Sequence, residues 1–343
     1  MSDLKFYHRP LVQRGSARPE DAVALAGGAL WFTHVQVLSR TTAPRIIPAS
    51  DLSHEVLRRL TARRPAIAGL NMGRVNVMGI LNVTPDSFSD GGKFEHADVA
   101  VAHAGDMITA GADILDIGGE STRPGAAFVP AQVEIARTAP VIAAIRAFSH
   151  VPISIDTRKS QVAQAALVAG ATLVNDVYAF THDANLARVT ADAAAPVCLM
   201  HAQGDPEVMQ DQPEYADVLL DVYDFLEQRI EYAVKAGISR EQIIVDPGIG
   251  FGKTVAHNVQ IMAGLSLFHA LGCPILLGAS RKRFIGTIAG EPVADQRLGG
   301  SLAVALAGAA QGVQIIRVHD IKQTKQALAL WQAMSSGEYN DVP

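Results

Sequence analysis

Polar and charged side chains stand at the ends of eight short apolar runs between residues 75 and 319. The residues that end these runs, in chain order, are Asn82, Asp116, Asp156, Asn175 with Asp176, His201, Asp246, Ser280 with Arg281 and Lys282, and Arg317 with His319. One set among them consists of carboxylates and amides, which can bind a ring with amino, imino and carbonyl edges: Asp116, Asp156, Asn175 and Asp246. A second set suits a phosphate or pyrophosphate: Lys282, Arg317, His319, Ser280 and Arg123. Together the two sets predict a site for a polar heterocycle that carries an anion.

The first run continues into a polar loop that ends in two glycines, within Met78–Gly92. This loop carries Asp86 and Phe88, and the run before it ends at Asn82. Oxygen atoms of Asn82 and Asp86 are ligands of the kind that Mg²⁺ prefers, since this ion keeps several waters and bridges phosphates. A zinc site is not expected, because neither HExxH nor CxxC spacing occurs.

The elements that must position these residues form a regular repeat. Eight apolar runs have the length of buried strands: 75–82, 114–118, 153–156, 173–176, 197–201, 243–246, 275–278 and 315–319. Eight segments with helical spacing alternate with them: 97–110, 130–148, 160–169, 184–193, 215–236, 258–270, 295–311 and 321–334. Eight strand–helix units in about 260 residues predict an α/β fold of the (β/α)₈ TIM-barrel type, in which all strand ends converge on one mouth. An open, doubly wound sheet is the alternative.

Residues 1–73 lack this repeat and are expected to be an N-terminal extension that packs on the barrel domain, residues 74–343. Residues 30–38 resemble a short strand, and residues 52–60 a short helix capped by Ser50 or Asp51. A role in binding a partner or in regulation is the alternative for this extension.

The composition of the chain argues against several classes of protein. The chain has 343 residues, of which 49% are hydrophobic and 18% charged, and its net charge is −5. This charge gives no reason to expect nucleic acid or an anionic membrane as a partner. No apolar run approaches the ~18 residues of a membrane helix, and the polar N-terminus does not resemble a secretory signal. Cys198 and Cys273 are expected to be buried thiols, which predicts a cytoplasmic protein.

Two local patterns imitate other chemistry. Gly248–Thr254 ends like a P-loop, but its glycines fit neither the Walker pattern nor the dinucleotide-binding pattern. We interpret it as a glycine-rich turn that brings Phe251 against a flat ligand. Lys282 could form a Schiff base, but Arg281 and Arg283 beside it favour a positive site for an electron-rich or anionic ligand.

With these residues in view, the sequence resembles the dihydropteroate synthase family. The motifs that carry the resemblance occur in family order over about residues 74–335: GILNVTPDSFSDGG at 79–92, DIGGESTRPG at 116–125, SIDT at 154–157, ND at 175–176, MH with QG at 200–204, DPGIGFGK at 246–253, SRKR at 280–283 and RVHD at 317–320.

The resemblance implies that 6-hydroxymethyl-7,8-dihydropterin pyrophosphate and 4-aminobenzoate are joined to 7,8-dihydropteroate with release of pyrophosphate, that Mg²⁺ is the cofactor, and that the protein is a homodimer. It implies catalytic roles for Asp116, Lys282, Arg317 and His319. It implies that the pterin is bound by Asp156, Asn175, Asp246, Phe251, Lys282 and Arg317. It places the pyrophosphate, the metal and the aminobenzoate near Asn82, Phe88, Thr122, Arg123, Pro124, Arg317 and His319, with Asn82 as metal ligand.

The chain departs from many relatives at Ile249, Ala202 and Arg283, which puts affinity and sulfonamide sensitivity in question. Two alternatives stay open: a methyltetrahydrofolate–corrinoid methyltransferase, which shares the pterin-binding barrel, and a non-catalytic paralogue that binds pterin.

Overall fold

The computed structural model describes residues 5–84, 93–121, 126–204 and 213–337, with the side chains of 93–96 left aside. Its centre is a barrel of eight parallel strands: β6 (Asn76–Asn82), β7 (Ile114–Gly118), β8 (Ile153–Asp156), β9 (Leu173–Asp176), β10 (Val197–Met200), β11 (Ile243–Asp246), β12 (Leu276–Leu277) and β13 (Ile315–Val318). The hydrogen-bonded order is β11-β10-β9-β8-β7-β6-β13-β12, and a parallel bridge between Val245 and Ile275 joins the two ends. The predicted (β/α)₈ barrel is therefore confirmed, and the open sheet is excluded.

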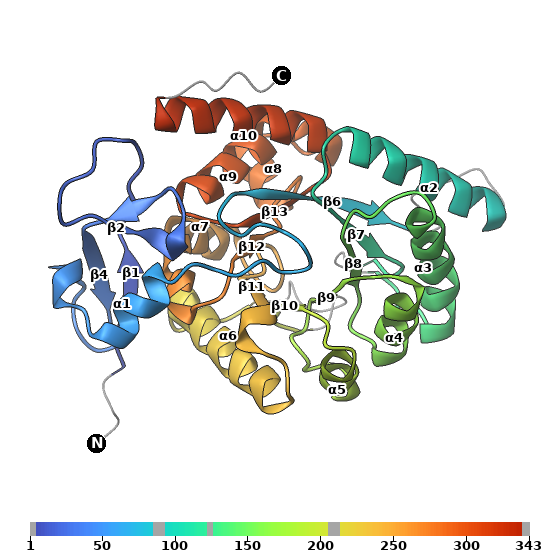
Figure 1. Ribbon diagram of the computed structural model, residues 1–343, viewed down its shortest axis with the longest axis horizontal. Coiled ribbons are helices and arrows are strands. Elements are labelled where there is room, and N and C mark those ends of the chain that lie inside the picture. The colour runs from blue at the N-terminus through green and yellow to red at the C-terminus, as the bar shows by residue number, and fades with distance from the viewer. Residues whose placement is uncertain (1–4, 85–92, 122–125, 205–212, 338–343) are drawn as a thin grey trace.

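Helices surround the barrel (Figure 1). They are α2 (Lys93–Thr109), α3 (Ala131–Arg146), α4 (Ser160–Ala169), α5 (Asn185–Asp192), α6 (Val218–Lys235), α7 (Val255–Ala263), α8 (Arg283–Ala289), α9 (Leu298–Ala310) and α10 (Ile321–Ser336). The expected helix at 258–270 is in fact α7 followed by a 3₁₀ helix, Leu265–Leu271. The short helix α8 had no counterpart in the sequence prediction.

Apolar side chains fill the barrel at the end where the strands begin. One buried cluster holds a residue from most of the strands: Met78, Ile114, Leu173, Cys198, Ile244, Leu276 and Ile315. Ile67, Leu70 and Met72, from the segment that precedes β6, join this cluster and close that end of the barrel. The end of the barrel where the strands begin is thus filled with apolar side chains, so a polar site is expected at the opposite end, as is usual for this fold.

The N-terminal extension forms its own small sheets beside the barrel (Figure 1). β1 (Tyr7–Pro10), β4 (His34–Leu38) and β5 (Arg45–Pro48) pair antiparallel, as do β2 (Val23–Ala24) and β3 (Trp31–Phe32). The helix α1 (His54–Thr61) is capped by Ser53, whose side chain accepts from the Val56 amide, so the predicted cap at Ser50 or Asp51 was wrong.

Contacts between the extension and the barrel are both apolar and ionic. Tyr7, Phe32 and Leu60 belong to the same buried cluster as Phe268 of the 3₁₀ helix. Arg40 forms ion pairs of 2.6 Å with Asp221 and Asp224 of α6. No helix in the described part of the chain is long and apolar enough to cross a membrane. Cys198 and Cys273 are both free and buried.

Candidate active site

The C-terminal ends of the strands bring the predicted polar residues to one mouth. In the strand register, Asp116 on β7 pairs with Ile80 and Ser154, and Asp156 at the end of β8 pairs with Gly118 and Asn175. Asp116 is fully buried, and Asp156, Asn175 and Asp246 are each at most 7% exposed. Buried carboxylates need a counter-charge or hydrogen-bond donors, so their partners define the site.

Arg317 is the main partner, because its guanidinium bridges two of these carboxylates. Its Nε lies 2.5 Å from Asp116 Oδ2, and its Nη2 lies 2.8 Å from Asp156 Oδ2. The Asn175 amide also donates to Asp116, with Nδ2 at 3.3 and 3.2 Å from the two carboxylate oxygens. The two sets of residues that the sequence suggested are therefore interlocked: the arginine expected to hold an anion is paired with the carboxylates expected to hold the ring.

This arrangement perturbs the ionisation of the site. Burial raises the pKa of Asp156, and the Asp116 charge raises it further, while Arg317 opposes both. Asp156 Oδ1 is buried and has no hydrogen-bond partner among the described residues. Burial alone would lower the pKa of Arg317, but Asp116 and Asp156 outweigh it, so that pKa is raised. Asp156 thus presents an unsatisfied oxygen that can accept from, or when protonated donate to, a bound ring.

Lys282 follows β12, the strand that pairs with β13, which carries Arg317. Burial lowers its pKa to about 7, although the nearby Asp246 carboxylate raises it. Its Nζ donates to the Ile249 carbonyl and lies 4.2 Å from the centre of the Phe251 ring. Burial in turn raises the pKa of Asp246, with Lys282 opposing the shift. A lysine with such a pKa can hold a ligand in either protonation state.

The glycine-rich turn after β11 positions Phe251 and the Ile249 carbonyl. Gly248, Gly250 and Gly252 all have positive φ. A Cβ added at Gly248 would lie 1.8 Å from the His201 carbonyl oxygen, so only glycine fits there. The glycine-rich turn expected from the sequence is therefore present, and its close backbone approach at Gly248 is to His201.

Ser280 and His319 join the loops that follow β12 and β13. His319 Nδ1 lies 3.0 Å from Ser280 Oγ, and the His319 amide donates to the same oxygen at 3.3 Å. Arg281, between Ser280 and Lys282, does not add its charge to the site as we had expected. Its guanidinium pairs with Asp320 and Asp295 instead, and its backbone has a φ of 59°.

Asn82 ends β6 beside the bridged carboxylates. A Cβ placed on Gly118 would lie 3.6 Å from Asn82 Oδ1 and 3.8 Å from Asp156 Oδ2, so both oxygens border the same space. No group of three or more His, Cys, Asp or Glu side chains that could hold a metal occurs in the described ranges. The donors present fit Mg²⁺, which commonly takes one or two protein oxygens and completes its shell with water and phosphate.

Five of the residues singled out in the sequence lie outside the described ranges: Asp86, Phe88, Thr122, Arg123 and Pro124.

A buried lysine, Lys253, supports the turn after β11 and was not predicted. Its Nζ donates to the carbonyls of Gly248 and Phe251 at 2.9 and 3.0 Å and lies 2.8 Å from His201 Nδ1. Burial lowers its pKa well below the ordinary value. The apparent P-loop lysine therefore binds the protein's own backbone, which local sequence could not reveal.

A second unpredicted group lies behind the exits of β7 and β8. Lys159 Nζ lies 2.9 Å from Glu120 Oε2 and 2.7 Å from Glu134 Oε2, and it also donates to the Val129 carbonyl. Glu120 accepts in turn from the Val129 amide at 3.0 Å. The network fixes the described ends of the segment that follows β7. The sequence shows a lysine three residues after Asp156, but it does not show which acidic residues this lysine contacts.

The closed barrel, the bridged carboxylates and the lysine at its mouth define a (β/α)₈ enzyme class that binds a polar ring at the strand ends. The sequence profile described as pterin binding enzyme matches residues 78–319. The chain belongs to this family, and within it to the dihydropteroate synthases.

Known relatives support this membership over nearly their whole length. Dihydropteroate synthase of Escherichia coli K12 is 45% identical over 271 residues, covering 79% of this chain and 95% of the relative. The Bacillus subtilis enzyme is 46% identical over 260 residues, covering 75% and 88%. The structure of Xanthomonas albilineans dihydropteroate synthase with 4-aminobenzoic acid is 46% identical with a TM-score of 0.74, covering 80% of this chain and 97% of that one. Its complex with 7,8-dihydropteroate is 43% identical with a TM-score of 0.71 and similar coverage.

Proposed function

We propose that the protein is a transferase, a dihydropteroate synthase, which condenses 6-hydroxymethyl-7,8-dihydropterin pyrophosphate with 4-aminobenzoate to give 7,8-dihydropteroate and pyrophosphate. The observation that carries this proposal is the Asp116–Arg317–Asp156 bridge at the mouth, with Lys282 after the strand next to Arg317. It combines acceptors and donors for a pterin ring with cations for its pyrophosphate.

The pterin is proposed to lie between the two sides of the mouth. Asp156, Asn175 and Asp246 offer the amide and carboxylate oxygens that match the amino and ring N–H groups of a pterin. Lys282 offers a donor for a ring nitrogen or carbonyl. Phe251, which lies against the Lys282 ammonium, supplies an apolar surface at the edge of the ring.

Pyrophosphate departure requires cations at the leaving oxygen. Arg317 and His319, with Ser280 holding the His319 ring, are proposed to bind the departing group. Because Arg317 is paired with two carboxylates before the ligand arrives, substrate must compete for its N–H groups or use those that remain. Mg²⁺, held by Asn82 and the substrate phosphates, would supply further charge neutralisation.

Carbon–oxygen cleavage leaves positive charge on the pterin methylene, which the electron-rich ring delocalises. The buried Asp116 carboxylate lies near this charge and stabilises it. The amine of 4-aminobenzoate then attacks the methylene carbon, and the proton that it loses leaves the site. Exclusion of water is necessary, since water would otherwise capture the same carbon.

A homodimer in the cytoplasm completes the proposal. Met334 on α10 is 69% exposed, which offers apolar contact area. The two unpaired cysteines suit a reducing compartment.

The test is an initial-rate assay of pyrophosphate release. Release should require the pterin substrate, 4-aminobenzoate and Mg²⁺ together, and should fall at least ~100-fold in Lys282→Ala, because loss of a charged contact in a desolvated site costs on the order of 3 kcal/mol. Release that is absent from wild-type protein, or independent of the amine, would contradict the proposal. A corrinoid methyltransferase would instead transfer a methyl group and release no pyrophosphate.

A further inference from the structure

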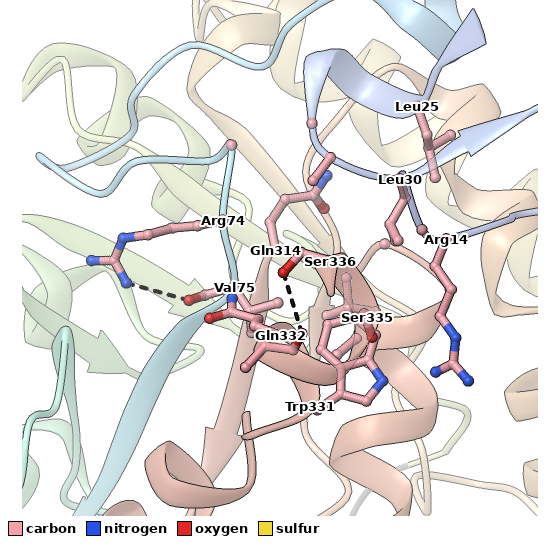
Figure 2. A pocket seen from close by; sticks show the side chains of 18 of the residues that line it. Arg14, Leu25, Leu30, Arg74, Val75, Gln314, Trp331, Gln332, Ser335 and Ser336 are labelled. Carbon is pink, nitrogen blue, oxygen red and sulfur yellow. Dashed lines mark hydrogen bonds between the residues drawn. The ribbon is translucent and has the colours of Figure 1, made fainter. Parts of the chain in front are cut away.

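A cavity of about 1030 Å³ lies at the end of the barrel opposite the mouth. Its walls come from four places: the extension, the C-terminal half of α10, the end of α9, and the residues just before β6 and β13, among them Val75 and Gln314. Figure 2 shows Arg14, Leu25 and Leu30 of the extension facing Trp331 and Ser335 of α10 across this space. The site is therefore separate from Asn82 and Arg317, which lie at the other ends of the same two strands.

The lining of the cavity is mainly apolar. Leu25, Leu30, Val75 and Trp331 contribute side chains to it. An aromatic ring and branched aliphatic groups around a volume of this order are typical of sites for small organic molecules. The same surface would be costly to leave in water, so an apolar occupant would stabilise it.

Among the described residues, the charged side chains of the lining are all cationic. They are Arg14, Arg18 and Arg74, and neither Asp nor Glu from the described ranges borders the cavity. This contrasts with the net charge of −5 for the whole chain. An anion would be attracted to this part of the surface, and a cation would be repelled.

The three arginines differ in what they already bind. Arg74 pairs with Asp113 at 2.7 Å, and Arg18 donates to the Ala29 carbonyl at 2.6 Å. Arg14 is exposed, and its guanidinium has no hydrogen-bond or ion-pair partner among the described residues. Ser335 Oγ, in the opposite wall, is buried and likewise has no partner within the described ranges. Within the described ranges, Arg14 is therefore the arginine of the lining whose guanidinium is available to a ligand.

We propose that this cavity binds a small amphipathic anion, an aromatic or acyl body that carries one carboxylate, sulfonate or phosphate group. Arg14 binds the anionic group, and Leu30 and Trp331 contact the apolar body. The family profile begins at residue 78, so the wall formed by residues 14–30 lies outside it. The extension thereby gives this chain a second ligand site, which is independent of the proposed reaction.

The probe for this test is 8-anilinonaphthalene-1-sulfonate, an aromatic anion whose fluorescence rises in apolar surroundings. Full-length protein should bind one equivalent saturably, and excitation of tryptophan should sensitise the probe because Trp331 lines the cavity. The Arg14→Gln variant should bind about tenfold more weakly, as expected for loss of one charged contact. The Arg188→Gln variant, which changes an exposed arginine on α5, is the matched control and should bind like wild type.

A neutral probe separates the contribution of the anionic group to binding from that of the apolar body. N-phenyl-1-naphthylamine lacks the sulfonate, so its affinity should be the same in wild type and Arg14→Gln. Trp331→Phe should reduce the sensitised emission while changing the affinity of the sulfonate probe less than about threefold. Pterin and pyrophosphate at saturating concentration should displace neither probe.

Four outcomes would overturn the proposal. They are binding of the sulfonate probe that does not saturate, an equal loss of its affinity in Arg14→Gln and Arg188→Gln, displacement of either probe by pterin or pyrophosphate, and an affinity for the sulfonate probe that falls as the protein concentration rises. The last would mean that a second copy of the chain covers the cavity.

Discussion

Replacement of Lys282 by methionine should abolish activity and stabilise the fold. The Lys282 side chain is half-buried, and desolvation lowers its pKa from the ordinary 10.5 to about 7. At 1.36 kcal/mol per pKa unit, keeping it charged costs about 5 kcal/mol. At pH 7, where about half of the side chain is neutral, the cost is about 4 kcal/mol.

The net gain is smaller than this cost, because Asp246 loses a favourable neighbouring charge and the Ile249 carbonyl loses a donor. We expect the free energy of unfolding of Lys282→Met to rise by about 1–3 kcal/mol at pH 6–7. The pH dependence follows from the direction of the shift. A lysine pKa that is lower in the folded state means that the unfolded chain binds more protons between pH 7 and 10.5, so wild-type stability rises across that window. The advantage of the variant should therefore be largest at or below pH 7 and shrink towards pH 10.

The assay is urea denaturation followed by far-UV circular dichroism at pH 6, 7, 8 and 9. Lys235→Met, at an exposed lysine of α6, is the control and should show no pH-dependent difference from wild type. A Lys282→Met variant that is less stable than wild type at pH 6, or an advantage that persists unchanged at pH 9, would refute the argument that burial of this ammonium is unfavourable.

Two further substitutions test the rest of the site. Arg317→Met leaves Asp116 and Asp156 without their shared cation and should lower the free energy of unfolding by about 3–5 kcal/mol at pH 8. This loss should be smaller at pH 5, because a carboxylate whose folded pKa is raised takes up a proton as the pH falls. A loss that is independent of pH would contradict this. Gly248→Ala should lower the free energy of unfolding by about 3 kcal/mol or prevent folding, because the new Cβ would meet the His201 carbonyl. Gly69→Ala, also at positive φ but with no atom within 4 Å of its Cβ, should lower it by only about 1 kcal/mol. Equal melting temperatures for the two variants would show that the close approach is unimportant.

The barrel could be predicted because each of its strands and helices is indicated by a pattern within a short stretch of sequence. Each strand is a short apolar run, and because the strand ends of a closed barrel converge, residues as distant as Asp116 and Arg317 could be assigned to one site before any contact was known. The confirmed fold follows from that regularity, whereas the family was indicated by the ordered motifs.

Pairings across the site were not predictable in the same way. Nothing near Arg317 in the sequence indicates that it bridges Asp116 and Asp156, or that Arg281 turns towards Asp320 and Asp295. These contacts depend on side-chain direction, which the local sequence does not reveal. The same limit applies to the extension, where β1 and β5 pair with β4 through contacts between short segments that have little periodicity.

The identity of the product tests the central proposal most directly. Purified protein should be incubated with 6-hydroxymethyl-7,8-dihydropterin pyrophosphate, 4-aminobenzoate and Mg²⁺, and the mixture should be analysed by mass spectrometry. The proposed chemistry predicts 7,8-dihydropteroate, formed in proportion to enzyme and absent when Arg317→Met replaces wild type. Hydrolysed pterin without dihydropteroate, or no turnover by folded wild-type protein, would contradict it.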